Sequence, residues 1–167
     1  MRRMALVGIC LTGVVFGTAA AQERSLDETL AYVNRTLKQH AFTDASGQAT
    51  VSKVELGKGT LVAWVTKTKA GNEISNVYEV ALADVDITEI VPRDRGGYVS
   101  LSLGATGPVK VRLVCLMQSG LTHEWDLPEV REIAVELAEG TGVERDLSRA
   151  LGELVAKARK DPRYTVA

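Results

Sequence analysis

One segment, residues 143–160, most constrains how this chain can fold. Its apolar side chains recur every three or four residues and its charged side chains fall on the opposite side, the spacing of a helix with one buried face. The apolar positions are Val143, Leu147, Ala150, Leu151, Leu154, Val155 and Ala158. Thr141 and Glu144 have the spacing of a capping box, and Asp161 and Pro162 mark the end of the helix. Such a helix needs a surface to cover, which the preceding residues supply.

Alternating apolar and polar residues between 49 and 138 predict short antiparallel strands. Six strands are expected at 49–57, 60–68, 74–83, 98–103, 109–117 and 129–138. A seventh, short strand follows a turn at Asp84 and ends before Pro92. Turns are expected at 57–59, 69–73, 93–97 and 104–108, and the longest irregular interval at 118–128. A helix is the alternative for 129–138, because Glu and Ala favour one. The sequence therefore predicts an α+β fold of seven strands followed by a helix.

A second helix is expected before the strands, from Ser25 to about Gln39. Ser25 and Glu28 have the spacing of a capping box. Its apolar residues form a narrow stripe of Leu26, Leu30, Val33 and Leu37. A narrow stripe predicts a helix that lies across a surface, on its own sheet or on another chain. This stripe is a candidate interaction surface.

The first residues have the features of a secretory signal peptide. Arg2 and Arg3 precede an apolar run from Ala5 to Phe16, and small residues then predict cleavage before Gln22. An uncleaved N-terminal anchor is the alternative. The expected organisation is a signal peptide at 1–21, a helix and linker at 22–48, an α+β domain at 49–160 and a flexible tail at 161–167. We therefore expect a periplasmic or secreted protein with no transmembrane segment in the mature chain.

The charge and cysteine content limit the classes of partner and site. Loss of Arg2 and Arg3 from the 20 Lys and Arg would leave 18 against 21 Asp and Glu, a net charge of about −3. A weakly acidic chain of this kind lacks the basic surface that binding to nucleic acid or to an anionic membrane would require. Cys115 would be the one cysteine of the mature chain, which excludes an internal disulfide. Its place in an apolar alternation predicts a buried side chain rather than a reactive thiol.

The order of these elements resembles the pleckstrin-homology-like fold. The resemblance covers 49–160 and is strongest at 78–91 and at 130–137, which leads into the helix. It implies an open barrel or sandwich of about seven antiparallel strands closed by a C-terminal amphipathic helix, here with an extra N-terminal helix. Membrane-binding members gather Lys and Arg on the first two strands, whereas Lys53 and Lys58 here accompany Glu55. The sequence thus has no phosphoinositide signature.

One group of neighbouring residues could take part in chemistry. It is the tetrapeptide His123, Glu124, Trp125 and Asp126. An imidazole and two carboxylates could serve proton transfer or a metal ion, but no second ligand follows at a metal-binding spacing. A solvated loop with the Trp125 ring against the sheet edge is the simpler interpretation. The acidic group Asp84, Asp86, Glu89 and Asp94 lacks the spacing of a calcium loop. We therefore expect no metal, no cofactor and no catalytic activity.

Three functions remain. The first is a non-catalytic binding module that holds a peptide, a protein or a small apolar ligand at a strand edge, at 118–128 or on the N-terminal helix. The second is an accessory subunit of an envelope complex that docks through the stripe of the N-terminal helix. The third is a small hydrolase that uses His123 with Glu124 or Asp126.

Overall fold

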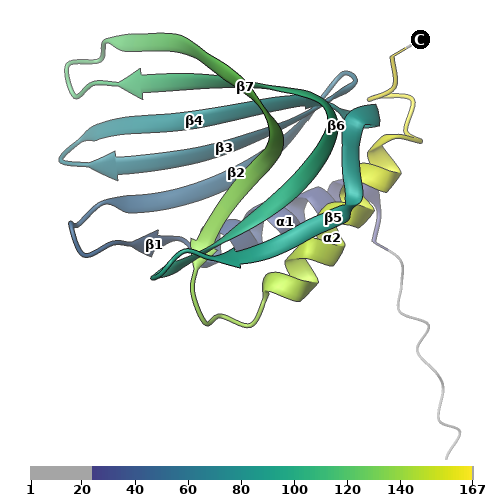
Figure 1. The fold of residues 1–167 in the computed structure, drawn as a ribbon, viewed down its shortest axis with the longest axis horizontal. Helices are drawn as coiled ribbons and strands as arrows, with labels where there is room; N and C mark the ends of the chain where they lie inside the picture. The colour runs from purple at the N-terminus through teal and green to yellow at the C-terminus, as the bar shows by residue number, and fades with distance from the viewer. Residues whose placement is uncertain (1–23, 167) are drawn as a thin grey trace, which may run out of the picture.

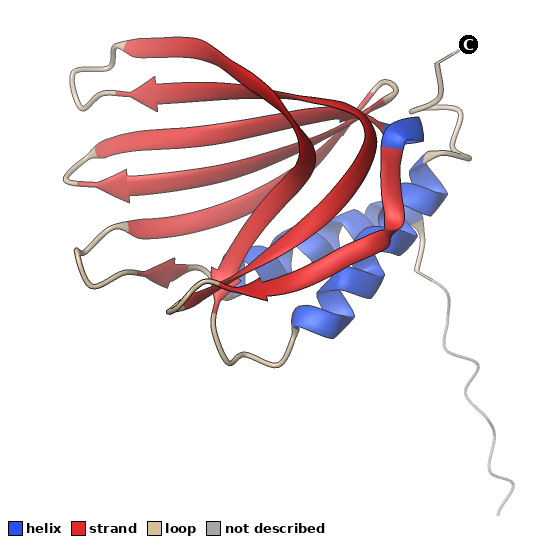
Figure 2. Cartoon of the chain, in the orientation of Figure 1, coloured by secondary structure: helices blue, strands red, loops and turns tan. Residues whose placement is uncertain are grey.

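Two helices and a seven-stranded antiparallel sheet make up residues 24–166, the part of the chain that the computed structural model describes (Figures 1 and 2). The expected α+β class is confirmed, and the expected signal peptide lies outside the described residues. The elements are α1 Leu26–Gln39, β1 Phe42–Thr43, β2 Ala49–Gly57, β3 Thr60–Lys69, β4 Asn72–Ala81, the 3₁₀ turn η1 Leu82–Asp84, β5 Val85–Asp94, β6 Tyr98–Leu116, β7 Thr122–Ala138 and α2 Glu144–Ala158.

The long strand β6 joins the two parts of the sheet. Its second half pairs with β4 and its first half with β5, while β7 pairs along its other side. The hairpin of β6 and β7 bends, so that the second half of β7 returns across β2 (Figure 1). There the Ser52 hydroxyl accepts a hydrogen bond from the Glu136 N–H and donates one to the Glu136 carbonyl, both at 2.8 Å. The sheet is therefore curled but open, and the face that carries Ser52 is its inner face.

The predicted breaks between the later strands are wrong at three places. The turn expected at 104–108 is a bend inside β6, where the register shifts between Gly104 and Val109 but pairing with β7 continues. A side chain at Gly107 would collide with the Asp84 carboxylate, so glycine here permits close approach rather than a turn. The irregular interval expected at 118–128 is mostly strand, because β7 begins at Thr122. β5 continues through Pro92, which an edge strand tolerates.

The apolar core lies between the two helices and the bent strands. α2 buries the expected face, including Leu147, Leu151 and Leu154, and it contacts α1 and β5. Its side chains pack with those of β6 and β7, namely Val99, Leu101, Leu103, Ile133, Val135 and Leu137. Those alternating residues also confirm a strand at 129–138.

The two predicted capping boxes have different outcomes. At α1 the Glu28 N–H donates to the Ser25 hydroxyl at 3.2 Å, and the Ser25 N–H donates to the Glu28 carboxylate at 2.7 Å. At α2 the prediction is wrong, because the residue before the helix is Val143, which makes no side-chain cap. The Thr141 hydroxyl contacts the Glu144 carboxylate at 3.4 Å instead of a backbone N–H. The sequence spacing alone did not distinguish these two geometries.

The stripe on α1 is covered by the chain itself. Leu26, Val33 and Leu37 are buried, and Leu30 is partly buried against the core. The buried threonines of α1 widen this face beyond the stripe, so the helix is sunk into the domain rather than laid across it. A subunit that docks through this stripe would first have to expose it, and that alternative loses its supporting surface.

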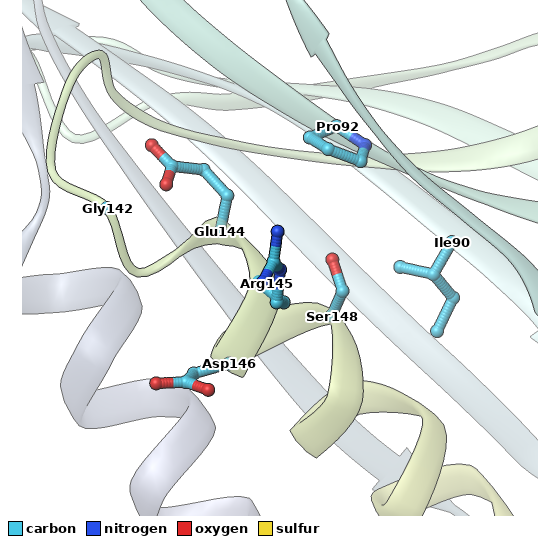
Figure 3. Close-up of a pocket in the computed structure, with 7 residues that line it drawn as sticks. All are labelled: Ile90, Pro92, Gly142, Glu144, Arg145, Asp146 and Ser148. Atoms are coloured by element: carbon cyan, nitrogen blue, oxygen red, sulfur yellow. The ribbon is translucent and has the colours of Figure 1, made fainter.

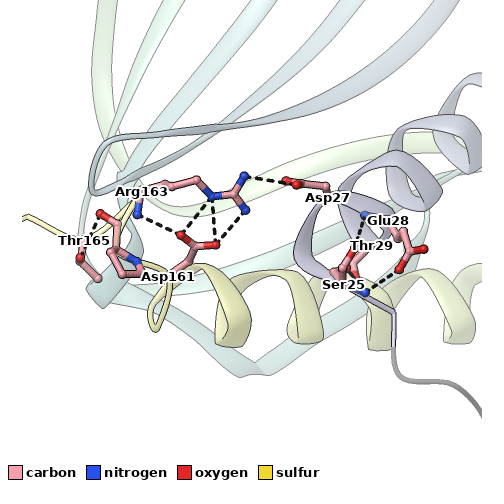
Figure 4. A network of polar contacts seen from close by, with 8 residues as sticks. Ser25, Asp27, Glu28, Thr29, Asp161, Arg163 and Thr165 are labelled. Carbon is pink, nitrogen blue, oxygen red and sulfur yellow. Dashed lines mark hydrogen bonds and ion pairs between the residues drawn. The ribbon is translucent and has the colours of Figure 1, made fainter.

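The segment after α2, expected to be a flexible tail, is held against the start of α1 (Figure 4). The Arg163 guanidinium lies 3.2 Å from the Asp27 carboxylate and also donates to Asp161 at 2.8 Å. The Tyr164 carbonyl accepts a hydrogen bond from the Gly59 N–H at 2.7 Å. These contacts bring the two ends of the described chain together.

Candidate ligand shelf on the inner face of the sheet

An exposed apolar surface continues across three strands on the inner face of the sheet. Cross-strand pairing places Ile74 beside Cys115 and Cys115 beside His123 in one row. The next row places Leu113 beside Trp125. A third row ends at Leu127, which pairs with Val111. We call Ile74, Leu113, Cys115, His123, Trp125 and Leu127 the inner shelf.

The inner shelf is open to solvent at its β4 and β7 sides. Trp125 is 50% exposed, Ile74 43% and Leu127 39%. The rings of His123 and Trp125 stack with centroids 5.7 Å apart and planes inclined by 22°. Single exposed apolar residues are common on proteins, but a contiguous group of them marks a contact surface. The strand pairing holds this group in a fixed arrangement before any ligand arrives.

Where the row of Ile74 continues towards the second half of β7, its side chains are polar and less exposed. Lys67, which pairs with Ile74, places its ammonium 3.5 Å from the Glu136 carboxylate. The nearby Ser102 residue is buried, and neither its hydroxyl nor the Glu136 Oε2 atom has a hydrogen-bond partner within residues 24–166. The ion pair at 3.5 Å is thus an electrostatic contact without a hydrogen bond. Both unpartnered atoms are buried, so the polar group that this end presents to solvent is the Lys67 ammonium, on a side chain that is 31% exposed.

Burial is the main cause that raises the pKa of the Tyr78 phenol above its usual value, and the negative charges of Glu136 and Glu132 add to it. A raised pKa in the folded state stabilises the protein at pH values below the unfolded pKa of about 10. That contribution is lost as the pH rises through the folded-state pKa. Urea unfolding of the wild type between pH 8 and 11 should therefore show an alkaline decline that Tyr78→Phe reduces. A Tyr32→Phe control should keep the decline; equal declines in all three proteins would contradict the prediction.

The predicted tetrapeptide is divided between two faces of β7. His123 and Trp125 lie on the inner shelf, whereas Glu124 and Asp126 point to the outer face because strand side chains alternate. The Glu124 carboxylate lies 3.3 Å from the Arg112 guanidinium on that face. His123 is therefore not brought together with either carboxylate, as the hydrolase alternative required. Trp125 belongs to a strand and not to a loop, and Cys115, which pairs with His123, is half-buried rather than buried.

Sequence reasoning missed Ile74, Leu113 and Leu127 as members of the site. A local signal existed for Leu127, because His123, Trp125 and Leu127 alternate with the two acidic residues in the manner of a strand. Ile74 and Leu113 join the site only through pairing between distant strands.

A hollow of about 670 Å³, separate from the inner shelf, lies between β5 and the start of α2 (Figure 3). Ile90 and Pro92 form one wall, and Arg145 and Ser148 point towards them from the helix. The remaining lining residues are Gly142, Glu144 and Asp146. Carboxylates and a guanidinium of opposite charge line this hollow together, and Ile90 and Pro92 are its apolar wall.

Comparisons with known proteins give no relative from which the function of the site could be inferred, so its function is inferred from the geometry of the site. The chain matches no protein-family model, no curated protein and no solved structure. Within residues 24–166, no three side chains of His, Cys, Asp or Glu converge as a metal-binding group. No helix in that range combines the length and hydrophobicity needed to cross a lipid bilayer. The inner shelf is the surface that best supports a function.

Proposed function

We propose that this protein is a non-catalytic binding module that holds a peptide or a small apolar ligand on the inner shelf. The observation that carries this proposal is the contiguous exposure of Trp125, Ile74 and Leu127 on one face of a paired sheet. Binding sites of this class combine apolar and aromatic walls with a few polar groups that orient the ligand. The Lys67 ammonium, at the end of the rows that approaches the second half of β7, supplies such a group.

The burial of apolar surface, rather than the attraction of charges, should supply most of the binding free energy on the inner shelf. Each square ångström of apolar surface removed from water contributes roughly 25 cal/mol, and a large aromatic side chain can remove more than any other residue type. Trp125 supplies this area from a β-strand, which costs less side-chain and backbone ordering than a mobile loop would. We therefore expect Trp125 to dominate the affinity for a ligand on the shelf.

We also propose that the protein is exported and has the pleckstrin-homology-like architecture. The charged and apolar N-terminal residues support export. An antiparallel sheet that leads into a C-terminal amphipathic helix supports the architecture. The unbroken strands β6 and β7 and the short strand β1 are features that the resemblance did not imply.

A neutral apolar fluorophore, N-phenyl-1-naphthylamine, tests the proposal in a Trp64→Phe background in which Trp125 is the sole tryptophan. Binding on the shelf should produce energy transfer from Trp125, and Ile74→Ala should weaken the affinity by about tenfold. The matched control is Val51→Ala, because Val51 is 40% exposed but lies on the outer face of β2. Equal affinities of Ile74→Ala and Val51→Ala, or no energy transfer, would refute the proposed site.

A further inference from the structure

The first half of β7 is a strand edge that the described chain leaves uncovered. Among residues 24–166, Thr122–Leu127 pairs with β6 alone and forms the upper margin of the sheet in Figure 1. On β2, by contrast, a side chain satisfies part of the backbone: the Asn34 amide donates to the Val54 carbonyl and accepts from the Val54 N–H, both at 2.8 Å. The second half of β7 is satisfied in the same way by Ser52. The uncovered edge lies directly beside the inner shelf.

The two faces of this edge differ in chemistry. The inner side presents His123, Trp125 and Leu127, and the outer side presents the carboxylates of Glu124 and Asp126. No Lys or Arg occurs in Thr122–Leu127. Arg112 lies opposite Asp126 in the strand register but makes its ion pair with Glu124, and Asp126 forms no ion pair of its own within residues 24–166. A strand laid along this edge would meet apolar side chains on one face and negative charge on the other.

The charge disfavours a second copy of the chain as the occupant. Two β7 edges paired antiparallel would place Glu124 and Asp126 of one copy close to the same residues of the other. Like charges across a strand pair are destabilising, and charged side chains on an edge strand are a known device against such pairing. Pro128 limits the usable edge further, because it has no N–H to donate. Basic side chains on an incoming strand would instead be complementary.

We propose that the occupant is an extended peptide segment of another protein, which adds as a strand to Thr122–Leu127 and alternates apolar residues with Lys or Arg. This inference rests on the proposed function, because the apolar residues of the segment would occupy the inner shelf beside Trp125. Its basic residues lie on the outer face beside Asp126. Strand addition gains affinity from main-chain hydrogen bonds and specificity from alternate side chains, and the edge supplies both.

Synthetic peptides of defined pattern test the pairing. A peptide that alternates Val and Lys should bind, whereas alternating Val and Glu should bind about tenfold more weakly or worse, since like charges replace opposite ones. N-methylation of every second amide of the peptide distinguishes strand addition, which needs main-chain hydrogen bonds to β7, from binding through side chains alone. Methyl groups on the amides that face β7 should abolish binding, and methyl groups on the other set should leave it within about threefold. Isothermal titration calorimetry measures each affinity.

The Asp126→Lys variant should reverse the charge preference, so that the Val and Glu peptide binds better than the Val and Lys peptide. Glu153→Lys is the matched control, because Glu153 is exposed on α2 away from this edge, and it should keep the wild-type preference. Equal effects of the two variants would show a general charge effect and overturn the inference. So would equal binding of the two N-methylated peptides, or a concentration-dependent dimer of the wild type that Asp126→Lys strengthens.

The fluorophore separates failure of this inference from failure of the proposed function. If no peptide binds but N-phenyl-1-naphthylamine still receives energy from Trp125, the strand-addition inference is wrong and the shelf remains a site for small apolar ligands. If neither the peptides nor the fluorophore bind, the proposed function is wrong as well.

Discussion

Replacing Leu151 with alanine should lower the free energy of unfolding by about 2–5 kcal/mol, and Leu154→Ala should do the same. Both side chains are 0% exposed and belong to the core formed by α2, α1 and the bent strands. The cost combines the lost transfer of the three carbon atoms that alanine lacks with a cavity that rigid neighbours fill only in part. Urea unfolding followed by circular dichroism measures the change in midpoint.

The control for this prediction is Leu121→Ala, because Leu121 is 61% exposed in the turn between β6 and β7. A surface truncation should change stability by less than about 0.5 kcal/mol. Similar midpoints for Leu151→Ala and Leu121→Ala would mean that α2 does not cover the sheet, and the architecture would be wrong.

Replacing Arg159 with methionine should cost about 2–3 kcal/mol. The Arg159 guanidinium donates hydrogen bonds to three backbone carbonyls where β4 passes into β5. These carbonyls belong to Leu82 at 2.8 Å, Ala83 at 3.3 Å and Val85. Methionine keeps the apolar stem but leaves the carbonyls without their charged donor. Thermal and urea unfolding of the variant measure the loss.

Two further variants separate geometry from charge at this position. Arg159→Lys keeps the charge, but one ammonium cannot reproduce a planar fork, so it should recover less than half of the loss. Arg149→Met removes an exposed arginine whose contact is the Asp146 carboxylate at 2.8 Å, and it should change stability little. If Arg159→Lys restored full stability, the fork geometry would be irrelevant and charge alone would act.

The helices were predictable because their signals are local. The capping box of Ser25 and Glu28 and the apolar face around Leu151 both repeat within one or two turns of helix. The hairpin of β2 and β3 was equally accessible, because the glycines at 57 and 59 lie between two alternating segments. Each of these elements is decided by residues that are neighbours in sequence.

The bent strands were not predictable, because turn-forming residues have a different effect inside a paired hairpin. Gly104 and Pro108 favour a turn locally, but pairing with β7 and the close approach of Asp84 make this segment a bend. For the same reason only part of the site was found. The tetrapeptide His123 to Asp126 was recognised, whereas Ile74 joins it only because it pairs with the distant Cys115, which in turn pairs with His123.

The ion pair between Arg163 and Asp27 places both ends of the described chain on the helical side of the domain, and the tips of the β6 and β7 hairpin lie on the other side (Figure 1). A label or surface linker attached before α1 would therefore point the edge of β7 outward. Immobilised in that orientation, the protein would present Trp125 to solution with no steric competition from the support.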